Sequence, residues 1–200
     1  MSKSEQTPII ILELNEFNVD LLKQAAKDLG LENLNKVINS FQQTSYKTND
    51  RYNSGFLEPW VQWVSIHTGM PSKTHQIKHL GDIPDCQYAG IWETLSQLGV
   101  STGVWGVMNA ARGQAEKNSF FFPDPWTFTE RAYPEKLNLL LDLPRYLAKN
   151  YRNLKISSLV ILGSRLIKGL LGSGIFKALT SELWKLWKDL RKLGHHHYVY

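Results

Sequence analysis

Oxygen-bearing side chains gather where an apolar run of the sequence ends. Residues 8–14 read Pro-Ile-Ile-Ile-Leu-Glu-Leu, and Asn15 and Glu16 follow, so three such side chains crowd one turn. Hard divalent cations favour carboxylate and amide oxygens as ligands. Asn15 is therefore a candidate ligand for a metal ion or a substrate. It is also a candidate N-cap of a helix beginning at Glu16, and the two roles do not exclude each other.

A second group of candidate residues begins at Glu58, which directly precedes a proline. Apolar spacing predicts a helix over residues 60–67, and the start of a helix offers backbone amides and the positive end of the dipole to an anion. Phosphate or sulfate would suit such a place, where Glu58 could act as a metal ligand, a general base or a carboxylate nucleophile. The alternative is that Glu58 is an ordinary first-turn acid and that Trp60 and Trp63 are core or interface aromatics.

Alternating strands and helices would have to position these residues. The run at residues 8–14 predicts a central strand covered on both faces, and a helix follows it as far as Gly30. The remaining predicted strands lie at 41–48 and 100–107, and the remaining helices at 31–38, 60–67 and 90–98. This alternation predicts an α/β fold, with a mostly parallel sheet flanked by helices. Ligands bind beyond the carboxyl ends of such strands, so we expect Asn15 and Glu58 to share one pocket.

Three segments, in order along the chain, resemble the alkaline phosphatase superfamily, in particular its phosphodiesterase/nucleotide pyrophosphatase and sulfatase-like branches. They are PIIILELNEFNVDLL at residues 8–22, EPWVQWVSIHTGMPSKTHQI at residues 58–77 and GIWETLSQLGVSTGVWGV at residues 90–107. The resemblance implies an α/β hydrolase of phosphate or sulfate esters that uses one or two divalent metals, zinc or calcium. Trp60, Thr68 and His75, all within the second segment, are candidate ligand-binding residues, and His75 matches the histidine of the family's HGI sequence.

The chain departs from this family at several positions. Asn15 stands where the family has a metal-binding Asp, no Ser, Thr or Cys falls at the nucleophile position, and Gln76 replaces a Gly. No Asp after residue 100 is followed by His, although the family draws its remaining metal ligands from such motifs. Two interpretations stay open: the amino-terminal portion of a longer enzyme, or a shortened relative. A non-catalytic module that binds an anionic glycan, lipid headgroup or protein partner is the alternative function.

Net charge divides the chain into two predicted parts. Residues 1–130 hold 10 Lys/Arg and 14 Asp/Glu, a net charge of −4, whereas residues 131–200 hold 13 and 4, a net charge of +9. We expect an α/β core over 1–130 and a basic helical segment over 131–200, after an aromatic loop at 120–126. Helices are predicted at 135–150, 154–171 and 175–193. Residues 155–193 are amphipathic and predict either peripheral contact with a membrane or helices that pack on the core or form a cap over its pocket.

Composition excludes several classes of protein. The chain has 200 residues, of which 42% are hydrophobic and 20% charged, which is typical of a globular domain rather than a disordered tail. A single cysteine, Cys86, and the absence of a leader-like segment predict a cytoplasmic location. No motif indicates nucleic-acid binding. Three consecutive histidines at 195–197 cannot all face one metal ion from a regular helix or strand.

Overall fold

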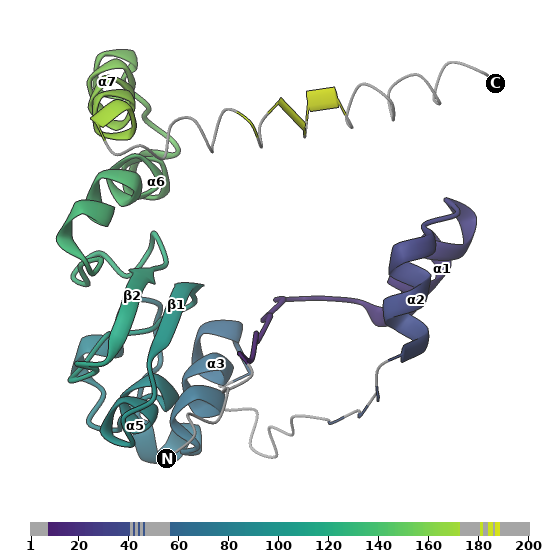
Figure 1. The fold of residues 1–200 in the computed structure, drawn as a ribbon. Coiled ribbons are helices and arrows are strands. Elements are labelled where there is room, and N and C mark those ends of the chain that lie inside the picture. The colour runs from purple at the N-terminus through teal and green to yellow at the C-terminus, as the bar shows by residue number, and fades with distance from the viewer. Residues whose placement is uncertain are drawn as a thin grey trace, which may run out of the picture.

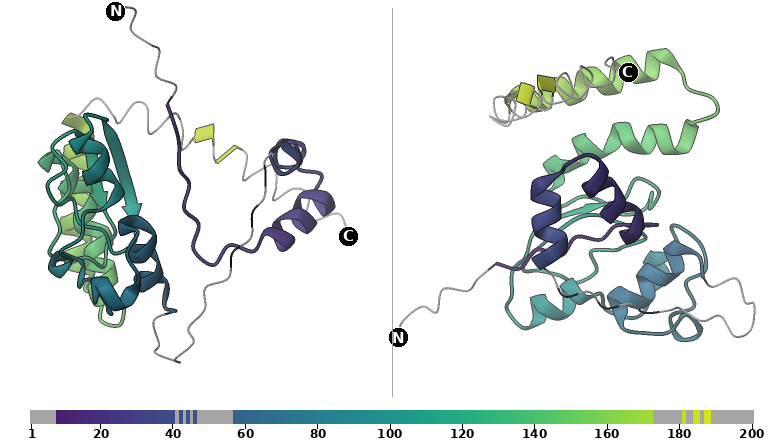
Figure 2. Two further views of the ribbon diagram at one scale, coloured as in Figure 1. Left: turned by 90° about the horizontal axis from the view of Figure 1, so that it is seen from below. Right: turned by 90° about the vertical axis from the view of Figure 1, so that its right-hand side faces the viewer.

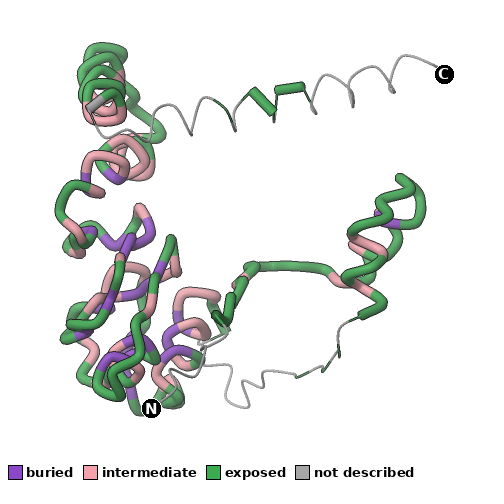
Figure 3. The backbone as a smooth tube through the Cα atoms, viewed as in Figure 1, coloured by how far each residue is buried: buried purple, intermediate pink, exposed green. Residues whose placement is uncertain are grey.

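The computed structural model describes residues 8–40, 42, 44, 46, 57–172, 181, 184, 185, 187 and 188. Over these residues the protein is a mixed α/β structure with a two-stranded parallel sheet (Figure 1). The predicted α/β class is thus confirmed at this coarse level. Helices lie on both sides of the sheet, and the buried residues concentrate around it (Figure 3).

The sheet consists of β1 (Thr102–Val107) and β2 (Asn118–Pro123). They run parallel, with Val104 opposite Phe121 and Trp105 opposite Phe122. The strand predicted at 100–107 is confirmed, but the aromatic loop predicted at 120–126 is wrong over residues 120–123. Pro123 ends the strand, where its missing N–H removes no interior ladder bond, so the proline did not prevent pairing.

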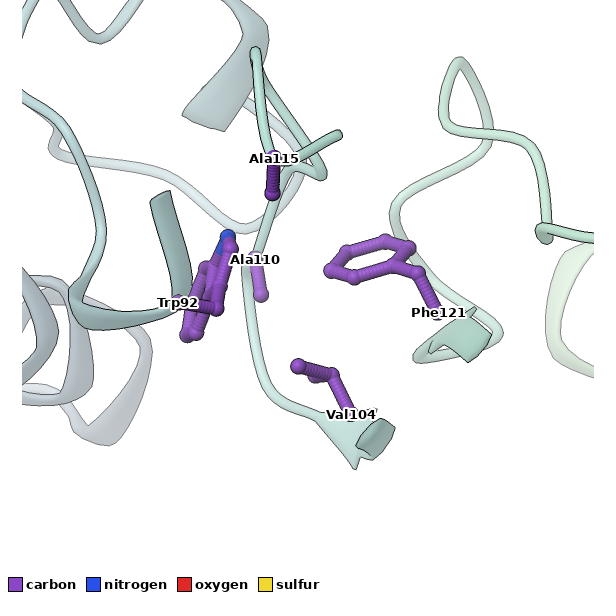
Figure 4. Close-up of a cluster of buried hydrophobic side chains, with 5 residues drawn as sticks. All are labelled: Trp92, Val104, Ala110, Ala115 and Phe121. Atoms are coloured by element: carbon purple, nitrogen blue, oxygen red, sulfur yellow. The ribbon is translucent and has the colours of Figure 1, made fainter. Parts of the chain in front are cut away.

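Each face of the sheet packs against a different helix. Because side chains alternate along a strand, Val104 and Phe121 point to the face covered by α5 (Ile91–Gln97), where they meet Trp92 (Figure 4). Phe122 points to the opposite face and packs against Leu141 of α6 (Asn138–Asn150). The basic helical segment is therefore anchored on the sheet through α6.

The helix predicted at 60–67 is present as α3 (Pro59–Thr68). Proline at the first helical position is pre-set for the helix, and Gly69 ends it in the left-handed conformation at φ +69°. The short helix α4 (Ser72–His75) and the 3₁₀ turn η1 (Ile83–Asp85) follow. Val64, Ile77 and Ile83 form a buried cluster that holds these pieces together.

The strand predicted at residues 8–14 is absent. These residues are extended but form no strand, and the side chains of Ile9 to Leu12 are 70 to 91% exposed. A β-rich run forms a strand only where a neighbour completes its ladder, and within the described residues β1 pairs with β2 and not with this run. The segment leads to the hairpin of α1 (Val19–Asp28) and α2 (Glu32–Ser40), which lies apart from the sheet (Figures 1 and 2).

The predicted N-cap of the first helix is also wrong. Asn18, rather than Asn15, caps α1 by accepting a hydrogen bond from the amide of Leu21 at 2.9 Å. The helix starts three residues later than predicted because the turn at 15–16 places Glu16 at φ +53°, outside helical geometry. Gly30 takes a left-handed conformation after the helix, as predicted.

The carboxyl-terminal helices agree with the prediction where they are described. The turn η2 (Glu135–Leu137) leads into α6, and α7 (Ile156–Gly172) then packs antiparallel to α6 (Figure 2). The strand predicted at 41–48, the helix predicted at 175–193 and the histidines at 195–197 lie wholly or mostly outside the described residues. Among the described helices, none has the length and apolar character needed to cross a bilayer.

Candidate functional site

A carboxylate–imidazole pair joins the amino-terminal segment to α3. Oε1 of Glu13 lies 2.9 Å from Nε2 of His67, which belongs to the last turn of α3. His67 is buried, and the Glu13 side chain is one-quarter exposed. The sequence placed Glu13 in a candidate turn, but nothing in local spacing pairs it with a histidine 54 residues away.

Two tryptophans surround the imidazole of His67. Trp63, one helical turn earlier on α3, stacks on it with ring centroids 5.7 Å apart. The ring of Trp92, from α5, lies tilted against it with ring centroids 5.3 Å apart. Nδ1 of His67 is buried and has no hydrogen-bond partner among the described residues. Since Nε2 faces Glu13, Nδ1 is the nitrogen left for another proton donor, an acceptor or a ligand.

Two cavities adjoin this pair. The first, called here the apolar groove, has a volume of about 410 Å³ and is lined mainly by apolar side chains together with Glu13 and Asn15. The second, called here the polar cavity, has a volume of about 440 Å³ and is lined by His67, Thr68, Glu93 and Glu130, among others. Trp92 lines both, so the Glu13–His67 pair lies at the boundary between them.

The structure does not bring Asn15 and Glu58 into one of these cavities. Asn15 lines the apolar groove, whereas Glu58 is exposed at the start of α3 and lines neither. Glu58 occupies the N-cap position, but its side chain makes no capping hydrogen bond. The expectation of a shared pocket for these two side chains therefore has no support from the geometry.

The start of α3 also offers fewer amides to an anion than the sequence suggested. Pro59 has no N–H, and the amides of Val61 and Gln62 both donate to the carbonyl oxygen of Glu58, at 2.9 and 3.0 Å. Trp60 is half-buried, and its indole N–H donates to the carbonyl of Lys78 at 3.2 Å. Trp60 thus has a structural contact at the position where a ligand contact was predicted.

The hydroxyl of Thr68 is occupied by its own helix. Oγ1 donates to the carbonyl oxygen of Val64 at 2.7 Å and accepts from the amide of Met70 at 3.2 Å. Thr68 lines the polar cavity, as expected of a ligand-binding residue. These two hydrogen bonds end α3 and leave no base beside the hydroxyl, so Thr68 is not arranged as a nucleophile.

His75 is buried and hydrogen-bonded to Ser65, with Nε2 and Oγ 2.9 Å apart. Its Nδ1 accepts from the amide of Ile77 at 3.0 Å, so in the neutral ring the proton is on Nε2 and is donated to Ser65. Burial lowers the pKa of His75, which favours this neutral form. His75 therefore cannot activate Ser65 as a base, because its only basic nitrogen faces a backbone amide.

The predicted zinc or calcium site does not fit the residues found here. Within the described part of the chain, no three side chains of His, Cys, Asp or Glu are grouped so that they could hold a metal ion. The Glu13 carboxylate, the nearest candidate partner for Asn15 in sequence, bonds His67 instead.

Comparison with known proteins gives no match. No family model, curated protein or solved structure matches the chain.

Proposed function

We propose that the protein is a hydrolase of phosphate or sulfate esters in which the Glu13–His67 pair is the acid–base group. One observation carries the proposal: a buried imidazole accompanied by a carboxylate at one nitrogen and unpartnered at the other. A carboxylate that accepts a hydrogen bond from Nε2–H fixes the tautomer and leaves a lone pair on Nδ1. Such an imidazole has the free lone pair that a general base needs.

The reaction is a transfer to water. Nδ1 of His67 takes a proton as the water oxygen forms its bond to phosphorus or sulfur. The ester bond to the alcohol oxygen breaks, and the leaving alkoxide takes that proton back from the imidazolium. Glu13 stabilises the imidazolium between the two transfers. Water is the nucleophile because the Ser65 hydroxyl faces the protonated Nε2 of His75 and the Thr68 hydroxyl donates to a backbone carbonyl.

The apolar groove suits the alcohol part of the ester. Trp63, Trp92 and Trp105 line it together with aliphatic side chains, next to the Glu13 carboxylate. Burial of an aryl or acyl group there would supply binding energy away from the charged centre. Glycan or lipid esters and small aryl esters are the substrate classes to test.

Turnover of aryl phosphate, phosphodiester and aryl sulfate by the purified chain tests the proposal, with and without added Zn²⁺ or Ca²⁺. We expect His67→Gln to lower kcat about 100-fold or more. The exposed histidine His79 provides the matched control, and His79→Gln should retain the rate. Equal rates for the two variants would exclude His67 as the acid–base group.

A non-catalytic binding module is the second candidate. The engaged hydroxyls of Ser65 and Thr68 favour it, because neither of these two side chains is arranged as an activated nucleophile. Titration of the same esters into the chain, followed by calorimetry, separates the two functions. Heat of binding without product would support the module, whereas product formation would exclude it.

A further inference from the structure

Helix α7 has apolar side chains on two sides, and only one side is covered within the described residues. Its inner side packs on α6, where Gly169 lies directly against Leu139. Its other side, called here the outer face of α7, consists of large apolar residues that are 52 to 79% exposed: Ile156, Val160, Ile161, Ile167 and Leu171. Several exposed large apolar side chains on one helix face normally mark a contact surface for a second partner.

The positive charge around α7 indicates which kind of partner fits its outer face. Residues 143–180 contain seven Lys or Arg and no Asp or Glu. Two of these cations, Arg165 and Lys168, are exposed on α7 itself. A second copy of the chain docking here would bring like charges together, which opposes self-association. An anionic surface is the complementary partner.

The shape of the region favours a lipid surface over an acidic protein. The outer face follows a helix of 17 residues, about 26 Å long, rather than a pocket with fixed polar groups. Further along the chain, Trp184 and Trp187 are exposed and stack at 4.8 Å, and Nζ of Lys188 lies 5.5 Å from the Trp184 ring. Tryptophan beside lysine is typical of residues at a membrane–water interface.

We propose that the outer face of α7 docks on the surface of an anionic lipid bilayer, with its apolar side chains inserted among the headgroups and its cations paired with lipid phosphates or carboxylates. The helix lies along the surface rather than across it, because 17 residues interrupted by Arg165 and Lys168 do not make a span. This inference does not depend on the proposed hydrolysis.

Vesicle flotation with the full chain tests the proposal. We expect flotation with vesicles of phosphatidylcholine mixed with phosphatidylserine, and none with phosphatidylcholine alone. The double variant Val160→Glu/Ile167→Glu should abolish flotation. The matched control is Leu21→Glu/Leu98→Glu, which adds the same two charges at apolar side chains away from α7. Leu21 is 67% exposed and Leu98 is 73% exposed, and this control should float.

A second variant separates charge from apolar contact. Arg165→Gln/Lys168→Gln leaves the apolar side chains in place and should weaken partitioning about 30-fold, since each cation near an anionic surface contributes about one kcal/mol. Circular dichroism of every variant reports whether α7 stays folded.

Several results would overturn the proposal. They are absence of flotation on anionic vesicles by the unaltered chain, and equal flotation of Val160→Glu/Ile167→Glu and its control. A dimer in light scattering that the same variant dissociates would assign the outer face to a second copy. Binding to an acidic polypeptide but not to vesicles would assign it to a protein.

Discussion

The backbone amide of Asn109 donates a hydrogen bond to Oδ2 of Asp124 at 2.8 Å. This hydrogen bond joins the carboxyl ends of β1 and β2. Asp124 also accepts from the amides of Trp126 and Thr127 and from the Thr127 hydroxyl. The side chain of Asn109 reaches the carbonyl of Trp60, so the same network fixes the start of α3. The sheet edge where a ligand would be sought is thus occupied by structural hydrogen bonds.

Replacement of Asp124 by alanine should strongly destabilise the fold. Asp124 is 1% exposed, and the loss of its carboxylate would leave two buried amides, those of Asn109 and Thr127, and the partly buried amide of Trp126 without an acceptor. Each buried amide left unpaired costs about 1–3 kcal/mol. We expect the free energy of unfolding in urea to fall by about 3 kcal/mol or more. Asp142→Ala, at an exposed carboxylate on α6, is the control and should change it by less than about 0.5 kcal/mol.

The pH dependence of stability should report on His75. Burial lowers its pKa below the ordinary 6.5. Between the lowered pKa and 6.5, the unfolded chain therefore binds a proton at His75 that the folded chain does not bind. The contribution of neutral His75 to the free energy of unfolding is fully present above about pH 6.5 and is lost as the pH falls towards the lowered pKa. His75→Asn keeps an acceptor for the amide of Ile77 but does not titrate.

Urea unfolding between about pH 7 and about pH 5, a range around the ordinary pKa of histidine, measures this effect. The loss of stability on acidification should be smaller in His75→Asn than in the unaltered chain. His79→Asn, at an exposed histidine, should keep the full loss. Identical slopes in all three proteins would show that His75 is not the group responsible.

Local patterns predicted the helices well, because the signals that begin and end them are local. Pro59 and Gly69 mark both ends of α3, and Gly30 follows α1 as predicted. The sheet was predicted less well, because a strand depends on a partner distant in sequence. Residues 8–14 have strong β propensity yet no ladder, whereas the proline-ended run 118–123 pairs with β1.

The candidate site was predicted only in part, because its local features have sequence signals and its long-range contact does not. The turn containing Glu13 and Asn15 was singled out, and both side chains line the apolar groove. The partner of Glu13 is His67, however, and a contact across 54 residues has no local signal. The position of Glu58 before Pro59 predicts its place at the start of a helix but not the direction of its exposed side chain.

Gly113 should be more sensitive to substitution than Gly99. Both have positive φ, at +55° and +78°, so alanine at either costs about 1 kcal/mol in backbone strain. A Cβ at Gly113 would also overlap the Glu93 carboxylate, which accepts from the amides of Gly90 and Gln114, whereas Gly99 has open space. Gly113→Ala should lower the unfolding free energy by at least about 1 kcal/mol more than Gly99→Ala. Equal losses would mean that Glu93 moves aside without cost.

Glu13 should act as the tether of the amino-terminal segment. Its hydrogen bond to His67 is a side-chain link between this exposed, unpaired stretch and the buried end of α3. Glu13→Ala should let the segment move freely and lower the order parameters of the backbone amides of residues 9–15 to below about 0.6, the range of a flexible chain. Glu16→Ala, an exposed carboxylate in the same turn, is the control and should leave those order parameters unchanged. If the two variants give equal order parameters, the contact with His67 does not hold the segment, and the acid–base pair would need another element to keep its carboxylate in place.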